Sequence, residues 1–362
     1  MDHAYDVIIV GRGIAGVVLG ETLLAMGKRV AMFDVAKPNA ASPVAAGVVN
    51  PVVLRRITLS WRAAEMLALA EPFYRQLEHE SGNPFWHPMP LAKLFHTERE
   101  AAAWDAHMRD AEVGPFLAQG EVPGFDAGKF NAPFGYGLVK RCAWLDVNAM
   151  LAAHRVKWSA MNALVEREVR PEDLHTTDDG VRVHGASAPW LIWCTGPFAP
   201  LPGLAPTRGE LLKLHLPELE TEAMVHRGGF LLPIGNDRYK VGSTFAWDNV
   251  WSGPTESGKE ELLRKLKNLT PDPSPERGGN RGIHSPSPWE RGLGGEVHAA
   301  GVRPASRDRR PMLGQVSPHQ AVLNGLGSRG VLLAPWCANL LIAHLFNGAP
   351  LDPEVDASRF NR

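Results

Sequence analysis

The stretch YDVIIVGRGIAGVVLGETLLAMGKRVAMFD, residues 5–34, decides the fold of the chain. It opens with a short apolar run, Val7 to Val10, which is typical of a fully buried parallel strand. Apolar residues then recur at helical intervals, and Gly27 marks the end of a helix. A second apolar strand over residues 29–33 ends at Asp34. This order predicts a strand, a helix and a second strand, paired in parallel.

Three glycines between the first strand and the helix have the spacing G-x-G-x-x-G: Gly11, Gly13 and Gly16. Gly11 permits a tight turn, Gly13 lets the backbone approach a pyrophosphate, and Gly16 lets helix and strand pack closely. Asp34 stands where a carboxylate can accept hydrogen bonds from an adenosine ribose. Glycines can also mark turns alone, but here strand, helix, second strand and acidic residue stand in order. We therefore expect a dinucleotide site.

The composition is that of a globular protein of two domains. The chain has 362 residues, a formal net charge of −1, 44% hydrophobic and 21% charged residues. A near-neutral balance gives no reason to expect nucleic acid or an anionic membrane as the main partner. Cys142, Cys194 and Cys337 stand singly, so we expect neither disulfides nor a metal site, and a reducing compartment fits.

Two further features bear on location. The opening MDHAYDVIIVG lacks a basic segment, so we expect no signal peptide. The most apolar run, Val331 to Phe346, contains Pro335 and is shorter than the ~20 residues that a membrane span needs. We interpret it as a buried helix and expect a cytoplasmic protein without a membrane span.

A set of motifs in a fixed order carries a family resemblance. After the glycine motif come S-x-x-A-A-G-x-x-x-P from residue 42, CTG at 194–196, and RGELL at 208–212. AGVRP-x-x-x-D-x-x-P and G-x-G-x-x-G-x-x-L-A-P follow within 298–335. In this order the chain resembles the D-amino-acid-oxidase-like superfamily of FAD-dependent amine oxidoreductases, which includes glycine oxidase and sarcosine oxidase.

The resemblance implies FAD as cofactor. The small-residue segment 40–47 would lie along the flavin and the pyrophosphate, and CTG would end a strand beside it. The loop GLGSRG would bring the N-terminus of the last helix to the flavin pyrimidine, where a positive dipole end stabilises negative charge; its glycines could also be turn residues alone. The expected cofactor-binding residues are Gly11, Gly13, Ile14, Ala15, Gly16, Asp34, Ser42, Ala46, Gly47, Thr195, Gly196, Gly325, Gly327, Ser328 and Gly330.

The fold class that follows is α/β, with a Rossmann-type FAD-binding domain and an α+β substrate domain whose sheet is mainly antiparallel. Alternating apolar and polar residues over 208–244, with the hairpin signal GNDR at 235–238, indicate that sheet. We expect the FAD-binding domain in residues 1–51, 143–205 and 297–362. The substrate domain would take 52–142 and 206–269.

Arg303 is the first candidate for substrate binding and Arg329 is the second. In the family the arginine of the GxRP motif can hold a substrate carboxylate, and the planar guanidinium suits a bidentate contact. Alternatively, Arg303 is tied to Asp308 or to the chain terminus, and Arg329 faces solvent. Trp61 and Trp247 could wall a cavity, although core packing is the better expectation for tryptophan.

The leading hypothesis is an oxidoreductase that transfers hydride from the α-carbon of a carboxylate-bearing primary or secondary amine to flavin N5. The electron acceptor would be oxygen or an electron carrier. No catalytic acid or base is required, because an uncharged amine needs only orientation and exclusion of water. Two alternatives remain: flavin-dependent modification of the tRNA wobble uridine, and a flavin-binding protein inactivated by an insertion.

That insertion is the segment 270–296, which is rich in Pro, Gly and Arg. It contains a near-repeat, PSPERGG and PSPWERG, and has almost no residues for a core. We expect it to be disordered.

Overall fold

The structure is a computed structural model that describes residues 3–270 and 297–361. The predicted insertion lies outside these residues except for Thr270. That residue is buried after helix α6 (Glu256–Leu269), and its hydroxyl donates to the carbonyl of Leu266 at 3.1 Å. Thr270 therefore belongs to the packed chain and not to the insertion.

The strands predicted within the first 34 residues lie in a six-stranded sheet of order β12-β3-β2-β16-β23-β22. Every neighbouring pair is parallel except β22 and β23. β2 and β3 are buried along their whole length, because helices and loops cover both faces of a parallel sheet. The strands are β2 (Val7–Val10), β3 (Val30–Phe33), β12 (Leu164–Val165), β16 (Trp190–Trp193), β22 (Met312–Ser317) and β23 (Gln320–Asn324).

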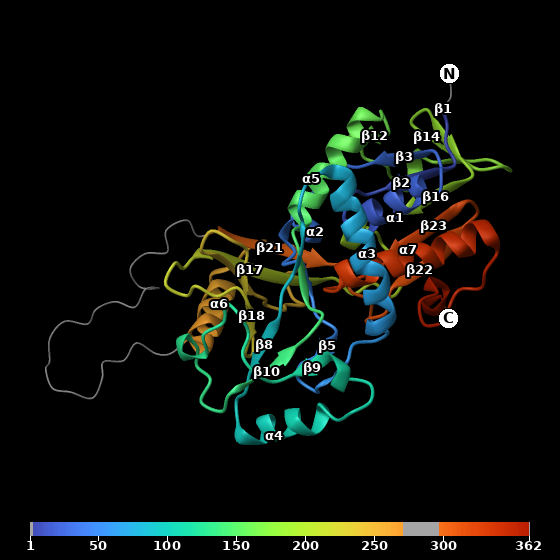
Figure 1. The fold of residues 1–362 in the computed structure, drawn as a ribbon. Coiled ribbons are helices and arrows are strands. Elements are labelled where there is room, and N and C mark those ends of the chain that lie inside the picture. The colour runs from blue at the N-terminus through green and yellow to red at the C-terminus, as the bar shows by residue number, and fades with distance from the viewer. Residues whose placement is uncertain (1–2, 271–296, 362) are drawn as a thin grey trace, which may run out of the picture.

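Helix α7 forms the centre of the layer beside this sheet. It packs against α1 and α3, as Figure 1 shows. Its length and composition would allow it to cross a membrane, but ten of its 18 residues are buried within the protein. This is the buried helix that the sequence predicted. The helices near it are α1 (Ile14–Ala25), α3 (Ala63–Ser81), α5 (Val147–Ala160) and α7 (Gly330–Asn347).

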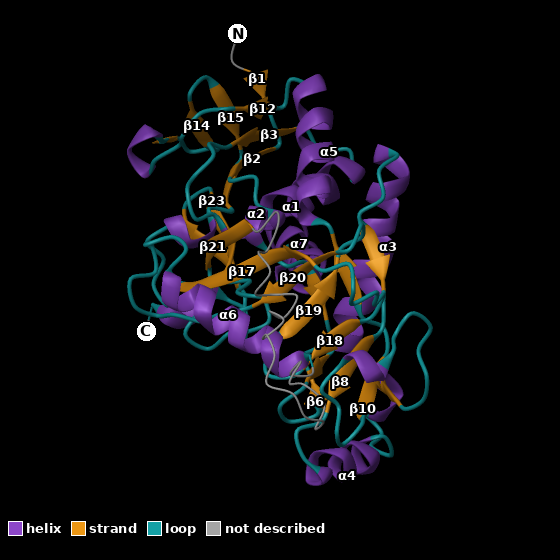
Figure 2. Ribbon diagram, turned by 90° about the vertical axis from the view of Figure 1, so that its left-hand side faces the viewer, coloured by secondary structure: helices purple, strands orange, loops and turns teal. Residues whose placement is uncertain are grey.

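The second large sheet has eight strands in the order β21-β17-β20-β19-β18-β8-β10-β9. Its pairs are antiparallel except β18 with β8, and β19 and β20 form the hairpin predicted around GNDR. In Figure 2 this sheet descends below the six-stranded sheet, with α6 packed on it and α4 (Glu98–His107) at its far end. The strands are β8 (Leu91–Leu94), β9 (Leu117–Ala118), β10 (Tyr136–Val139), β17 (Thr207–His215), β18 (Met224–His226), β19 (Phe230–Pro233), β20 (Arg238–Gly242) and β21 (Val297–Arg303).

Short strands and helices complete the fold. One sheet joins β1 (His3–Ala4), β15 (Ala186–Ala188), β14 (Val181–Val183) and β13 (His175–Thr176). A second joins β4 (Val48–Val49), β11 (Ala143–Leu145) and β7 (Trp86–Pro88), and a third pairs β5 (Val52–Val53) with β6 (Thr58–Leu59). Helix α2 (Ala41–Val44) holds the small-residue segment, and the 3-10 helices are η1 (Gly114–Phe116), η2 (Ala127–Lys129), η3 (Pro171–Asp173), η4 (Gly196–Phe198) and η5 (Ala357–Phe360).

The predicted fold class, a Rossmann-type part with a mainly antiparallel second sheet, is confirmed. One strand lies elsewhere than we placed it: β21, which we assigned to the FAD-binding part, forms the edge of the antiparallel sheet beside β17. The exact division into two domains stays our proposal. β21 ends beside α2, where Val302 bridges to Ala40, and Ala305 just after it bridges to Leu326, which follows β23.

Candidate functional site

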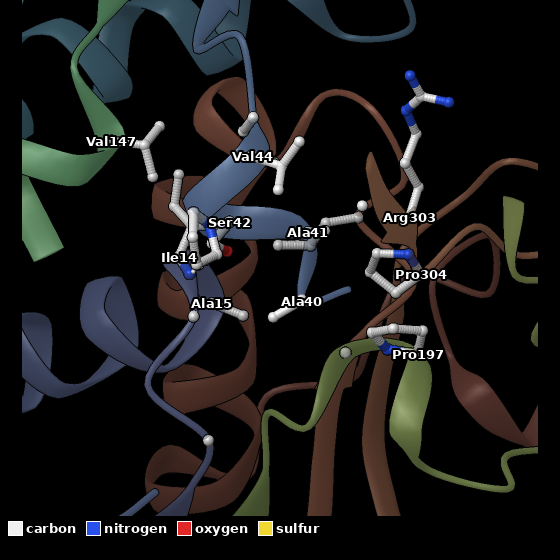
Figure 3. Close-up of a pocket in the computed structure, with 18 of the residues that line it drawn as sticks. Ile14, Ala15, Ala40, Ala41, Ser42, Val44, Val147, Pro197, Arg303 and Pro304 are labelled. Atoms are coloured by element: carbon white, nitrogen blue, oxygen red, sulfur yellow. Dashed lines mark hydrogen bonds between the residues drawn. The ribbon is translucent and has the colours of Figure 1, made fainter. Parts of the chain in front are cut away.

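The glycine turn has the close packing that its sequence predicted. Gly11 has φ of +106°, a conformation that residues with a side chain rarely adopt. A Cβ atom on Gly16 would overlap the carbonyl oxygen of Gly11, so glycine is needed for α1 to lie against β2. At the start of α1, the backbone N–H of Ile14 donates to Ser42 Oγ at 3.0 Å, and Figure 3 shows these two residues together. α2 thus meets the N-terminus of α1.

Asp34 stands at the end of β3, as expected, and its partner is Arg12. Its Oδ1 accepts from the backbone N–H of Arg12 at 2.9 Å, and the Arg12 guanidinium is 3.7 Å from Oδ2. Burial raises the pKa of Asp34 above its usual value, although hydrogen bonding and charge from Arg12 act in the opposite direction. Arg12 also donates to the carbonyl of Leu151 at 3.0 Å and is held in place on both sides.

A cavity of about 380 Å³ runs from the glycine turn past α2 to Arg303. It brings together residues from β2, β3, α2, the segment after β16, β17, β21 and the start of α7. The predicted residues on its wall are Gly11, Gly13, Ile14, Ala15, Asp34, Ser42, Ala46, Gly47, Thr195, Gly196, Arg303, Gly327, Ser328 and Gly330. Gly16 and Gly325 do not line it. Gly16 lies beneath the turn, and a Cβ on Gly325 would stand 2.8 Å from the Met312 side chain.

Arg303 extends from the last position of β21, and in Figure 3 it points away from Ala15 and Ala40. Its Nη1 donates to the carbonyls of Arg208 at 3.3 Å and Thr244 at 3.2 Å. Burial lowers the pKa of Arg303 to about 10, because the charged form loses hydration. Among the described residues, the guanidinium hydrogen-bonds only to these neutral backbone carbonyls, and its carbon lies 4.2 Å from the ring centre of Phe245.

The alternative partner for Arg303 is occupied. Asp308 accepts from Arg359 Nε at 2.8 Å, and among the described residues no ion pair includes Arg303. The chain terminus, the other alternative, lies outside the described residues. Buried charges in proteins are ordinarily paired, so an arginine without an anion on a cavity wall indicates an anionic ligand.

Arg329 is not brought to the same place. It is half-buried at the position before α7 and does not line the cavity. Burial and the neighbouring charges of Arg309 and Arg310 lower its pKa. The structure thus joins Arg303, but not Arg329, to the residues of the cavity.

Several cavity residues were missed from the sequence. Gly209 in β17 lies under Arg303, since a Cβ there would overlap the guanidinium group. A glycine inside a strand pattern signals such a close approach and could have found it. Arg12 and Lys37 also line the cavity, and Lys37 pairs with Glu168 at 2.8 Å. No local pattern distinguishes either residue from a surface cation.

The two tryptophans considered as cavity walls differ. Trp61 is half-buried, and its ring packs 5.4 Å from the ring of Trp336. Trp247 is 67% exposed, so the expectation of core packing was wrong for this residue.

Comparison with known proteins decides the family. Residues 6–344 match the family described as FAD dependent oxidoreductase, abbreviated DAO. The chain belongs to this family. The predicted resemblance and the cofactor FAD are thereby confirmed, and the protein is an FAD-dependent oxidoreductase.

Relatives similar in sequence to this oxidoreductase are longer proteins. The tRNA 5-methylaminomethyl-2-thiouridine biosynthesis bifunctional protein MnmC of Hahella chejuensis is 26% identical over 385 residues, covering 95% of this chain and 57% of the relative. The protein of the same name from Polaromonas sp. strain JS666 is also 26% identical, with coverage of 95% and 57%. The chain therefore spans a little over half the length of the curated relatives it matches.

Solved structures share the fold over the whole chain. Glycine oxidase from Geobacillus kaustophilus superimposes with a TM-score of 0.77 at 22% identity, covering 99% of this chain and 98% of the other. Iminodiacetate oxidase from Chelativorans sp. BNC1 gives 0.70 at 20% identity, with 98% of each chain covered. At this identity the likeness shows the fold.

The residues of the cavity fit FAD. The turn of Gly11 and Gly13 opens onto the N-terminus of α1, which suits a pyrophosphate. A Cβ on Gly13 would stand 3.1 Å from Ser42 Oγ and so narrow the passage. Thr195 Oγ1 is buried on the cavity wall and has no hydrogen-bond partner among the described residues, as expected of a hydroxyl that serves a polar ligand.

Proposed function

We propose that the protein oxidises a carboxylate-bearing primary or secondary amine, of the amino-acid or N-substituted glycine type. Arg303 carries this proposal: it is a half-buried cation on the cavity wall, and no carboxylate of the described residues pairs with it. Its two carbonyl partners leave the outer edge of the guanidinium available to a carboxylate. A bidentate contact would fix the position of the carbon next to that carboxylate.

We assign the opposite end of the cavity to FAD. Gly11, Gly13, Ile14, Ala15 and Ser42 would hold the pyrophosphate at the N-terminus of α1. Asp34 would accept from the ribose. The flavin would lie against Ala46, Gly47, Thr195 and Gly196, and Gly325, Gly327, Ser328 and Gly330 would direct the N-terminus of α7 to it. Gly16 supports the turn from beneath.

FAD supplies the acceptor for two electrons and a hydrogen from the amine carbon. The chain's own contribution is orientation, exclusion of water and charge. The two carboxylates on the wall, Asp34 and Glu168, would both lie at the adenosine end. Cys194 also lines the wall, but burial raises the pKa of its thiol well above the usual range, so the thiol stays uncharged. Among the described residues that line the cavity, Arg303 is thus the charged residue at the substrate end. The oxidised amine, an imine, hydrolyses in water without a further residue.

Anaerobic reduction of the bound flavin by a panel of amines tests the proposal. We expect bleaching of the flavin absorbance by glycine, N-methylglycine or larger N-substituted glycines, and little by the same amines lacking the carboxylate. Admission of air with an oxygen electrode then distinguishes oxygen from an electron carrier as acceptor. Flavin that dithionite reduces but no carboxylate-bearing amine reduces would overturn the proposal and favour an inactive flavin-binding protein.

A second candidate is modification of a uridine in tRNA, because the relatives similar in sequence are named for tRNA 5-methylaminomethyl-2-thiouridine biosynthesis. A methylaminomethyl group is a secondary amine, so the same cavity chemistry would apply. The formal net charge of −1 argues against strong RNA binding, which relies on cationic surfaces. A gel shift with bulk tRNA at low salt tests this candidate, and absence of any shift would count against it.

A further inference from the structure

Three neighbouring strands of the eight-stranded sheet contribute an apolar surface to the cavity. Leu211 in β17 and Phe230 in β19 line the cavity, and both pair with Gly242 of β20, which lies between them. Side chains alternate between the two faces of a strand, so Leu212 and Leu231 point the other way, into the core under α6. Leu211, Gly242 and Phe230 therefore form one row on the cavity face of the sheet. We call this row the apolar wall.

The two side chains of the apolar wall meet over Gly242. A Cβ atom on Gly242 would stand 2.3 Å from Leu211 Cδ2 and 2.4 Å from Phe230 Cζ, which is closer than non-bonded carbon atoms approach. The ends of both side chains thus occupy the space that a larger residue at this position would need. Neither side chain has a polar atom, so they offer a ligand van der Waals contact and an apolar surface.

The apolar wall begins beside Arg303. Gly209, which lies under the guanidinium, stands two residues before Leu211 in β17. Thr244, whose carbonyl accepts from Arg303 at 3.2 Å, stands two residues after Gly242. Residues two apart in a strand are separated by about 7 Å, which is the span of roughly five covalent bonds in an extended chain. A carboxylate bound at Arg303 would therefore bring the rest of a small amine against the apolar wall.

The apolar wall offers no partner to a second anionic group. Lys240 is the next residue on the same face of β20, but it does not line the cavity, and its ammonium donates to the carbonyls of Ala45 and Ala46 at 3.2 and 3.4 Å. A charged group against this surface would lose hydration without gaining an ion pair, which is unfavourable. The other charged side chains on the described cavity wall belong to the end that we assign to FAD: Arg12, Asp34, Lys37, Arg167 and Glu168.

We infer that the apolar wall selects substrates whose substituent, on the nitrogen or on the carbon beside the carboxylate, is uncharged and apolar. This rests on the proposed function, because it places the carboxylate at Arg303. Leu211 and Phe230 would contact the substituent, and Gly242 leaves room for both side chains. Amines with a second carboxylate would be rejected. Each methylene that fits an apolar pocket changes the preference of an enzyme by roughly 10- to 200-fold.

Binding of thioether acids to the FAD-loaded protein tests this inference without turnover. Methylthioacetate, isobutylthioacetate and thiodiacetate share the carboxylate that Arg303 would bind. The last two have the same number of non-hydrogen atoms in the same branched arrangement, and an isopropyl end in one replaces a carboxylate in the other. Their dissociation constants follow from the change in the flavin spectrum. We expect the isobutyl compound to bind at least about ten-fold more tightly than thiodiacetate, and more tightly than methylthioacetate.

Two variants assign the preference to the apolar wall. Phe230→Ala removes one side of the wall and should lower the preference for the isobutyl compound over methylthioacetate by at least about five-fold. Gly242→Ala displaces Leu211 and Phe230 and should weaken binding of the isobutyl compound more than that of methylthioacetate. Phe125→Ala is the matched control, because Phe125 is half-buried like Phe230 and does not line the cavity. Its three dissociation constants should equal those of wild type.

Anaerobic reduction of the flavin shows where the substituent is attached. N-isobutylglycine carries the isobutyl group on nitrogen, and leucine carries it on the carbon beside the carboxylate. Reduction by either compound supports the inference and assigns the position. Reduction by N-methylglycine but by neither isobutyl compound overturns it. So does thiodiacetate that binds as tightly as isobutylthioacetate, or a preference that is unchanged in Phe230→Ala.

Failure of this inference is distinguishable from failure of the proposed function. If the apolar wall shows no selectivity but methylthioacetate binds and N-methylglycine reduces the flavin, the proposed function stands. If no carboxylate-bearing compound binds or reduces the flavin, both fail.

Discussion

Replacement of Arg303 by methionine separates a ligand-binding arginine from a structural one. Methionine keeps an unbranched side chain of similar length and removes the charge. If Arg303 binds the substrate carboxylate, the variant loses charge-assisted hydrogen bonds of roughly 1.5–3 kcal/mol, which is about a ten- to 150-fold loss of affinity. Burial lowers the pKa of Arg303 to about 10, so the site destabilises the charged guanidinium when no anion is bound. A bound carboxylate would compensate for the hydration that the guanidinium has lost.

The structure predicts a different result for stability. Among the described residues, Arg303 donates only to the carbonyls of Arg208 and Thr244, and the former also accepts from the N–H of Ala246 at 3.0 Å. Loss of these bonds is offset by removal of a half-buried charge that no carboxylate of the described residues neutralises. We expect the free energy of unfolding of Arg303→Met to lie within about 1 kcal/mol of wild type. A structural role would instead produce a clear destabilisation.

The assay is a titration of the FAD-loaded protein with methylthioacetate, followed in the flavin spectrum. Arg227→Met is a matched control, because Arg227 also donates to two backbone carbonyls, at 2.7 and 3.3 Å, and does not line the cavity. Its dissociation constant should equal that of wild type. Gly209→Ala tests whether the position of the Arg303 guanidinium matters, because the new Cβ would displace this group without removing its charge. We expect it to weaken binding as well.

The pH dependence has a defined sign. An anion binds the protonated guanidinium, so affinity should be constant from neutral pH, where the ligand is a carboxylate, up to the pKa of Arg303, about 10, and fall as the pH rises through it. Arg303→Met should lack that step. An unchanged dissociation constant in Arg303→Met, together with a loss of stability of several kcal/mol, would refute the reasoning.

Three further variants test the cofactor end. Gly16→Ala should lower the melting temperature and the FAD content of the purified protein, because its Cβ would overlap the Gly11 carbonyl; normal FAD content would contradict the predicted close packing. Ser42→Ala removes the acceptor for the Ile14 N–H and should destabilise the FAD-free protein by about 0.5–2 kcal/mol in denaturant titrations, whereas an unchanged midpoint would argue against this contact. Burial lowers the pKa of Lys240 to about 8, and its ammonium donates to backbone carbonyls of the small-residue segment. Lys240 therefore loses its proton at a lower pH in the folded state than in the unfolded state. The free energy of unfolding of wild type should rise relative to that of Lys240→Met as the pH increases from about 8 to 10.5. A difference that does not change with pH would contradict the lowered pKa.

The local part of the site was predictable from the sequence. Gly11, Gly13 and Gly16 stand within six residues, and the physical demands on them are steric demands of one turn and one helix. Asp34 follows β3, which pairs in parallel with β2 and is buried along its whole length. These residues lie where we expected because each depends on neighbours close in the chain or in the adjacent strand.

The substrate end depended on contacts between distant segments. Asp308 pairs with Arg359, which lies 51 residues after it in the chain, and not with Arg303. The space under Arg303 depends on Gly209 in a strand paired with β21. The carbonyl of Asn249 accepts from Arg208, a residue 41 positions earlier in the chain. None of these relations has a signature in local composition.

Several features could be predicted without a structure: the glycine turn, the parallel strands beside it, the buried helix over residues 331–346 and, through an ordered set of motifs, the FAD-dependent family. Each of these follows from local sterics or from the periodicity of apolar residues. Packing of distant segments was needed to place Arg303, and not Arg329, on the cavity wall and to leave room for its guanidinium over Gly209. These features are set by long-range strand pairing and by competition among charged groups for partners, and such competition is resolved only when the chain is packed.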